Sequence, residues 1–165
     1  MLFRKPVPED GPAVHDLIGR CPPLDTNSLY CNLLQCTHFN DTSIAVENDD
    51  GEIVGFISGY IPPAQPDTLF VWQVAVDDSA RGQGLAGRML KALVQRDECS
   101  ACSYMQTTIT PDNKASWALF EGFAKKMNTE VKDRVLFGRD THFAGRHDDE
   151  NILTIGPFDA AAKES

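Results

Sequence analysis

The chain has 165 residues, of which 42% are hydrophobic and 24% are charged, and its formal net charge is −9. This length fits one domain, and the acidic balance argues against nucleic acid or an anionic membrane as a partner, since both require a basic surface. No apolar run approaches the roughly 20 residues that span a bilayer, and proline and charge interrupt the first six residues. We therefore expect a cytoplasmic protein whose acidic surface either serves solubility or favours a cationic substrate.

The spacing of apolar residues predicts seven strands and four helices. Strands are expected at 2–8, 42–47, 53–60, 69–76, 104–109, 130–137 and 152–155, and helices at about 12–20, 28–38, 83–95 and 113–125. In the last helix we expect Ala115, Ala118, Leu119 and Phe123 to face inward. The polar region 138–151 is predicted to be weakly structured, and residues 160–165 are predicted to form a frayed tail.

A glycine-rich loop joins the strand at 69–76 to the helix at 83–95. Glycines in such a loop let backbone amides approach a phosphate, and the start of a helix favours negative charge. The loop does not end in Gly-Lys-Ser/Thr, as a Walker loop does, and it follows the fourth strand rather than the first, as in a dinucleotide fold. The residues expected at this anion site are Arg81, Gly82, Gln83, Gly84, Leu85, Ala86, Gly87 and Arg88.

Two segments resemble the acetyl-CoA motifs of the GNAT superfamily. Val74–Ala86 is similar to its Arg/Gln-x-x-Gly-x-Gly/Ala signature, and Asn113–Phe120 is similar to its second motif, a helix that begins at an asparagine. The resemblance implies one GNAT domain over residues 1–165, an α/β fold with a mixed, mostly antiparallel sheet of six to seven strands and helices on both faces. It also implies acetyl-CoA as co-substrate, bound through a bulged fourth strand and the helix that follows. Besides the loop residues, it assigns cofactor binding to Val74, Ala75, Val76 and Asn113.

A narrower resemblance extends over nearly the whole chain. Pro22–Tyr30, Trp72–Val76 and His142–Glu150 are similar to the L-2,4-diaminobutyrate acetyltransferases of ectoine biosynthesis. Members of that family acetylate the 4-amino group of L-2,4-diaminobutyrate, are cytoplasmic and are usually homodimers, and their product is cyclised to ectoine, a compatible solute. The resemblance implies the same reaction here.

The matching segments contain the candidate acceptor residues. Glu150 and His147 are the candidate catalytic residues, with Glu150 as proton acceptor, and both are expected to contact substrate; alternatively they belong to a solvated acidic loop. Asp25 either binds the amine or caps the second helix, and Trp72 is either a pocket wall or core. The remaining candidates either hold the carboxylate and α-ammonium of the substrate or are cap and helix-face residues; they are Thr26, Asn27 and Tyr30.

One position departs from the GNAT pattern. The tyrosine that protonates the thiolate in many members is replaced by Phe120, which cannot donate a proton. A thiolate of pKa near 8.5 departs without full protonation, so acetyl transfer remains feasible. The alternatives are an acetyltransferase for another small diamine or diamino acid, and a non-catalytic acyl-CoA-binding module.

The cysteine pattern predicts reduced thiols. The chain has five cysteines, and Cys99 and Cys102 have the spacing of a redox pair or of half a zinc site. The sequence has no second pair at metal-ligand spacing, so we expect no metal.

Overall fold

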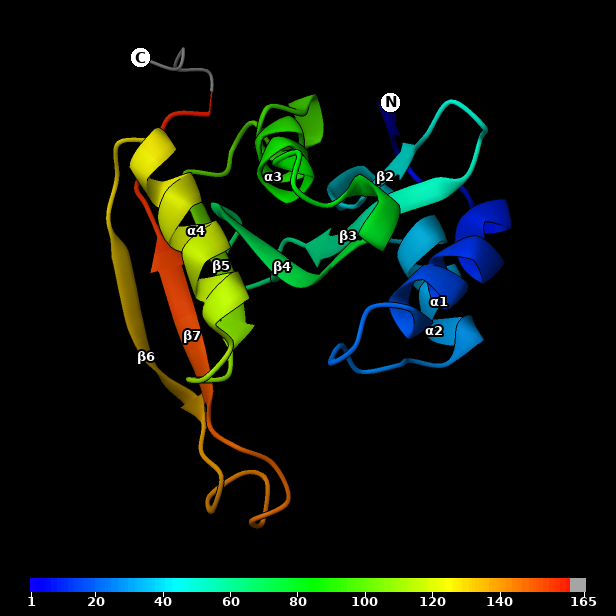
Figure 1. Cartoon of the computed structure of the whole chain (residues 1–165). Helices are drawn as coiled ribbons and strands as arrows, with labels where there is room; N and C mark the ends of the chain where they lie inside the picture. The colour runs from blue at the N-terminus through cyan, green and yellow to red at the C-terminus, as the bar shows by residue number, and fades with distance from the viewer. Residues whose placement is uncertain (161–165) are drawn as a thin grey trace.

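The computed structural model of the chain describes residues 1–160 and has a seven-stranded sheet with four α-helices (Figure 1). The strands are β1 (Leu2–Arg4), β2 (Ile44–Glu47), β3 (Ile53–Tyr60), β4 (Thr68–Val76), β5 (Tyr104–Ile109), β6 (Val131–Phe137) and β7 (Glu150–Ile155). The helices are α1 (Gly11–Gly19), α2 (Leu29–Thr37), α3 (Leu85–Val94) and α4 (Lys114–Lys126). The frayed tail was predicted at residues 160–165, and of these residues 161–165 lie outside the described residues.

The strand order is β1-β2-β3-β4-β5-β7-β6, and every neighbouring pair is antiparallel except β4 and β5. The parallel pair arises because the glycine loop and α3 return the chain to the same end of the sheet. The structure thus confirms the predicted mixed, mostly antiparallel sheet. Both β3 and β5 have the predicted bounds, while β7 begins at Glu150, two residues before the predicted strand.

Helices cover both faces of the sheet (Figure 1). One core lies between the sheet and α3 and α4, where Leu90, Leu93 and Phe123 are buried. A smaller core under α1 and α2 contains Val14, Leu17 and Phe56. Each such buried side chain contributes about 1.5–3 kcal/mol relative to exposure to water.

Helix α4 corrects one prediction. Its buried side is formed by Phe120, Phe123 and Ala124, whereas Ala115 and Ala118 are exposed. Ala118 instead lines a groove between α3 and α4, and Ala115 lines a separate cleft at the start of α4. Apolar spacing identifies a face that avoids water, but it does not distinguish a face packed on the core from one that lines a ligand groove.

Capping side chains explain where two of the helices begin. The Ser28 hydroxyl accepts a hydrogen bond from the Cys31 amide at the start of α2, and the Asn113 side chain accepts one from the Ser116 amide at the start of α4. Because Ser28 caps α2, the alternative that Asp25 is the cap is wrong. The side chain of Asp25 is exposed and available for other contacts.

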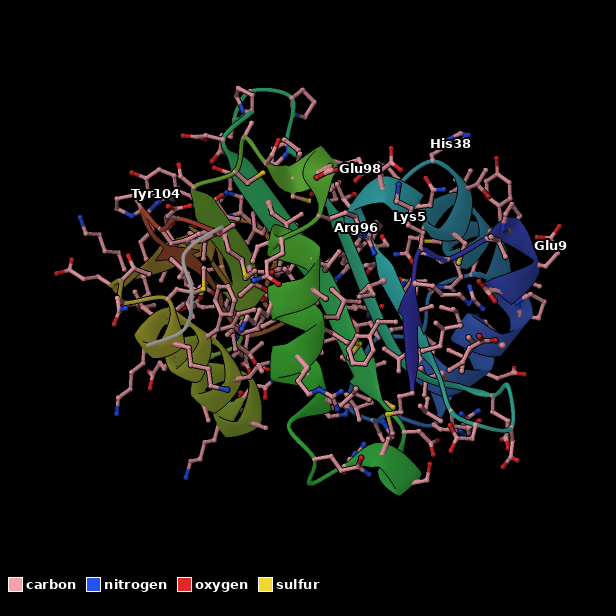
Figure 2. All side chains as sticks on the ribbon, turned by 90° about the horizontal axis from the view of Figure 1, so that it is seen from above. Lys5, Glu9, His38, Arg96, Glu98 and Tyr104 are labelled. Carbon is pink, nitrogen blue, oxygen red and sulfur yellow. The ribbon has the colours of Figure 1, made fainter. Side chains whose placement is uncertain are left out.

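A charged cluster fixes the C-terminal end of α3, away from the glycine loop. Lys5 pairs with both Asp41 and Glu98, and Arg96 donates to three backbone carbonyls, one of which is Ser43 at 2.6 Å. Figure 2 shows Lys5, Arg96 and Glu98 gathered at this end of the molecule. Every one of these side chains has a protein partner, so the cluster stabilises the packing of the segment after α3 against the segments around Lys5 and Asp41.

Candidate active site

The glycine loop and the start of α3 form a backbone site for an anion. Gly82 and Gly84 have φ values of +78° and +67°, a conformation that other residues rarely adopt. A Cβ placed on Gly82, Gly84 or Gly87 would meet no described atom within 4 Å, so the amides next to them are approachable. Gly84 is also the N-cap of α3 and has no side chain to cap the first amides, unlike Ser28 and Asn113. The open loop therefore fits a phosphate group.

A groove continues from this loop between α3 and α4, with a volume of about 250 Å³. Two lysines that the sequence reasoning missed, Lys91 and Lys126, line it together with Arg88. The guanidinium of Arg88 also lies 5.0 Å from the centre of the Phe3 ring. Arg81 folds back onto the end of β4, where its Nε donates to the Val76 carbonyl and its Nη1 lies 2.8 Å from Asp78 Oδ1.

Strands β4 and β5 part beside the loop. Their ladder runs from Thr68–Tyr104 to Val71–Thr107, and the Thr107 hydroxyl donates to the Val71 carbonyl at the last pair. The amide of Asp77, which follows β4, donates to the Val54 carbonyl in β3. Because amides alternate along a strand, those of Val76 and Val74 point the other way, into the opening beside β5.

The bulge expected in β4 is present, but its extra residue is Trp72. Gln73 pairs with Ser58 and Val71 pairs with Gly59, so Trp72 has no partner position in β3. The amides of Val74 and Val76 follow the bulge and are not part of it. Their direction into the opening results from strand alternation.

A cleft of about 800 Å³ lies where these elements meet the loop between α1 and α2. It brings together five of the predicted acceptor residues, which come from segments far apart in the sequence: Asp25, Asn27, Trp72, His147 and Glu150. Neither Thr26 nor Tyr30 lines it, and Tyr30 is 70% exposed. Trp72 is thus a wall of the cleft, 40% exposed, rather than a core residue.

Glu150 lines this cleft from the start of β7. Its side chain is 22% exposed, and Nε2 of His147 lies 3.7 Å from its Oε1. Burial raises the pKa of the Glu150 carboxyl, and the nearby Asp25 carboxylate raises this pKa further, against the opposing effects of His147 and a hydrogen bond from Thr108. A carboxylate with a raised pKa is a better proton acceptor than an ordinary glutamate.

The loop between β6 and β7 has no helix or strand from residue 138 to residue 149, as predicted, and its side chains contact one another. The ring of Phe143 lies 4.6 Å from that of His147 and 6.2 Å from that of Phe137, measured between centroids. The Arg139 amide donates to Asp149, and the Gly138 amide to His142. These contacts hold His147 at the mouth of the cleft, its Nδ1 2.7 Å from the Asp148 carbonyl oxygen.

The cleft residues that were not predicted from the sequence include one glutamine, one lysine and one phenylalanine. Gln73 was visible only as the polar exception in an apolar strand, Lys114 follows the motif asparagine, and Phe137 ends β6. Lys114 is the one lysine or arginine among the described residues that line the cleft, and no described residue forms an ion pair with it. Asn113 also lines the cleft, and its Oδ1 is already occupied in capping α4.

A parted strand pair, an open glycine loop and an adjoining acceptor cleft are the features of an acetyltransferase of the GNAT type. The sequence model of the Acetyltransferase (GNAT) family matches residues 12–124, and the chain belongs to this family. It is therefore an acyltransferase that uses acetyl-CoA, as the two motifs predicted.

Within the family, the chain is similar to proteins named for one substrate. It is 56% identical over 160 residues to the L-2,4-diaminobutyric acid acetyltransferase of Methylotuvimicrobium alcaliphilum, covering 97% of this chain and 92% of the relative. It is 47% identical over 158 residues to the enzyme of the same name from Halomonas elongata, covering 96% and 82%. The solved structure of the diaminobutyrate acetyltransferase EctA from Paenibacillus lautus, in complex with its substrate L-2,4-diaminobutyric acid and coenzyme A, matches with a TM-score of 0.89 at 39% identity, covering 99% of this chain and 98% of that one.

Proposed function

We propose that this enzyme transfers the acetyl group of acetyl-CoA to the 4-amino group of L-2,4-diaminobutyrate, giving 4-N-acetyl-L-2,4-diaminobutyrate for ectoine biosynthesis. The observation that carries the proposal is the cleft itself, which holds Asp25, Glu150 and Lys114 beside the opening between β4 and β5. A diamino acid has two amines and one carboxylate, and the cleft offers carboxylates and one lysine. The similarity to the named diaminobutyrate acetyltransferases supports the same choice.

On the cofactor side, the backbone contributes most of the contacts. Acetyl-CoA supplies the acetyl group as a thioester, whose carbonyl carbon is the point of attack. We assign the amides of Val74 and Val76 to the thioester and pantetheine, with Ala75 between them in β4. The pyrophosphate is assigned to the loop residues predicted from the sequence, Arg81, Gly82, Gln83, Gly84, Leu85, Ala86, Gly87 and Arg88. The lysines of the groove, Lys91 and Lys126, are assigned to the nucleotide end.

On the acceptor side, charge decides the assignments. Asp25 and Glu150 attract the ammonium groups, Asn27 offers a further polar contact, and Trp72 forms an apolar wall against the carbon chain. Lys114 is assigned to the α-carboxylate. Thr26 and Tyr30, which the resemblance also suggested for substrate binding, lie outside the cleft lining, so we assign them no contact.

The reaction requires the amine to lose a proton before it attacks. A primary alkyl amine has a pKa of about 10 and is mostly protonated at neutral pH. Glu150 is the acceptor for this proton, directly or through one water molecule, and His147 is its neighbour. Phe120 is 3% exposed and packs in the core under α4, so it contributes no proton to the departing thiolate.

The experiment that tests the proposal follows thiol release from acetyl-CoA with a panel of amines. A kcat/KM for L-2,4-diaminobutyrate well above those for ornithine, 1,3-diaminopropane and spermidine supports it. A preference for one of the other amines would show instead an acetyltransferase for that amine. Absence of turnover with every amine, together with tight acetyl-CoA binding in calorimetry, would identify a non-catalytic acyl-CoA-binding module.

We further propose that the enzyme acts as a homodimer in the cytoplasm during adaptation to osmotic stress. Val135 and Phe137, on the edge strand β6, are large apolar residues with 51% and 43% of their surface exposed, which favours a partner at this edge. No helix among residues 1–160 is both long and apolar enough to cross a membrane. Light scattering coupled to size exclusion tests the oligomeric state, and a monomer would contradict this assignment.

A further inference from the structure

The bulge in β4 places two consecutive side chains in the acceptor cleft. Neighbouring residues of a regular strand point to opposite faces, yet Trp72 and Gln73 both line the cleft. The extra residue at Trp72 makes this possible, because a bulge turns the chain locally and re-aims the side chains next to it. The Gln73 amide, next to the disturbed ladder, donates to the hydroxyl of Ser58, which is fully buried in β3. The bulge is therefore supported by a buried hydrogen bond.

The side chain of Gln73 bridges β4 to the segment between α1 and α2. Its Nε2 donates to the backbone carbonyl of Asp25 at 2.9 Å, and its Oε1 accepts from the side-chain amide of Asn27 at 3.1 Å. Residues 25–28 are neither helix nor strand, and the Asp25 side chain is exposed. The two hydrogen bonds thus tie this irregular segment, on both sides of Thr26, to a central strand of the sheet.

We infer that Gln73 is a positioning residue for the acceptor amine, which holds Asp25 at the distance from Glu150 that the substrate requires. The inference rests on the proposed function of the cleft. A primary amide both donates and accepts at this side-chain length, so it serves Asp25 and Asn27 at once. A glutamate accepts only, and a methionine of similar size does neither. Gln73 acts through Asp25 and Asn27 and does not itself touch the reacting atoms.

The Gln73→Met variant tests this role, with Gln106→Met as its matched control. Gln106 is a half-buried glutamine on the neighbouring strand β5, its Nε2 donates to the Thr154 hydroxyl, and it does not line the cleft.

Loss of two hydrogen bonds at Gln73 is expected to raise KM for the amine by about tenfold. KM for acetyl-CoA is expected to stay within about twofold of wild type, since the cofactor residues are unchanged. Gln106→Met is expected to leave both constants unchanged. A parallel rise in both constants for Gln73→Met, or the same rise in the control, would overturn the inference.

A double-mutant cycle with Asn27→Ala separates positioning from a general loss of packing. If Gln73 acts through the 25–27 segment, the rise in KM caused by Gln73→Met is smaller in the Asn27→Ala background than in wild type. Independent effects that multiply would contradict the coupling. Circular dichroism and acetyl-CoA calorimetry check that each variant is folded.

The acceptor panel distinguishes a failure of this inference from a failure of the proposed function. If the wild-type enzyme prefers an amine other than L-2,4-diaminobutyrate, the proposed substrate is wrong, and the comparison of Gln73→Met with Gln106→Met is made with the preferred amine. Unchanged KM for that amine in Gln73→Met would then overturn the positioning role on its own.

Discussion

Nε2 of His147 lies 3.7 Å from Oε1 of Glu150, while its Nδ1 lies 2.7 Å from the Asp148 carbonyl oxygen. A carbonyl oxygen only accepts hydrogen bonds, so the proton of a neutral His147 ring belongs on Nδ1. Nε2 then carries a lone pair and lies on the Glu150 side of the ring. At 3.7 Å it makes no direct hydrogen bond with Oε1, so in the proposed reaction Glu150 takes the amine proton itself or through one water molecule, with His147 as its neighbour.

Glu150→Gln removes the proton acceptor while keeping the size of the side chain. We expect kcat to fall by about 10²- to 10⁴-fold, the usual contribution of a general base. Affinity for acetyl-CoA, measured by calorimetry, is expected to stay at the wild-type value because Glu150 lies in the acceptor cleft. Glu130→Gln, an exposed glutamate outside the cleft lining, is the matched control and should retain full activity. Normal turnover in Glu150→Gln would remove Glu150 from the mechanism.

The raised pKa of Glu150 sets the acid limb of the pH profile. In the proposed mechanism, activity requires the ionised carboxylate of Glu150, so kcat/KM is expected to fall at a pH above the ordinary glutamate pKa of about 4.3. Burial is the main cause of the raised pKa of Glu150, and it stays when a neighbouring residue is substituted. The contribution of the Asp25 charge, in contrast, is removed by substituting Asp25. Asp25→Asn is therefore expected to lower the pKa of Glu150 and shift the acid limb to lower pH.

The control for this shift is Asp50→Asn, in the exposed turn between β2 and β3, which should leave the limb in place. The measurement is kcat/KM for the preferred amine from pH 4 upward. An acid limb that moves to higher pH in Asp25→Asn, or one that stays unmoved, contradicts the electrostatic coupling between Asp25 and Glu150.

The sequence predicts the cofactor half of the candidate site more fully than the acceptor half. The candidate cofactor residues Gly82, Gly84 and Asn113 belong to short contiguous motifs, so the sequence predicts the open glycine loop and the capped helix start from local backbone requirements. The fold was predicted for the same reason: in β5, buried Met105 and Ile109 alternate with less buried neighbours, a pattern legible within one strand.

The acceptor half depends on contacts between distant segments, which no local pattern contains. In the sequence, Gln73 is only a polar residue within an apolar strand. Its hydrogen-bonding partners Asp25 and Asn27 are identified only in the folded chain. The polar loop before β7 has no regular secondary structure, and the sequence does not predict the packing of Phe143 on His147 within it. Ring contacts of this kind have no periodicity in the sequence.

Gly84→Val tests the backbone site for the pyrophosphate. A β-branched side chain disfavours the left-handed conformation of Gly84 and covers the first amides of α3, so acetyl-CoA affinity is expected to fall about ten- to a hundredfold, the value of one or two charge-assisted hydrogen bonds. Gly51→Val is the matched control, because Gly51 has φ +78° and equally open surroundings in the turn between β2 and β3. It carries similar strain without touching the loop. If both variants lose acetyl-CoA affinity to the same extent in calorimetry, backbone strain alone, and not the loop amides, accounts for the loss.

Lys114→Met tests how the enzyme distinguishes a diamino acid from a diamine. Lys114 is the cleft residue assigned to the substrate carboxylate, so its loss is expected to raise KM for L-2,4-diaminobutyrate by about tenfold, or roughly 1.4 kcal/mol. KM for 1,3-diaminopropane, which has the same spacing of amines and no carboxylate, is expected to change by less than about twofold, since no partner of Lys114 is present in that acceptor. Lys125→Met, an exposed lysine near the other end of α4 that does not line the cleft, is the control for the lost charge. If Lys114→Met raises KM equally for both acceptors, the lysine shapes the cleft and the carboxylate must be bound by another group, such as the backbone amides at the start of α4.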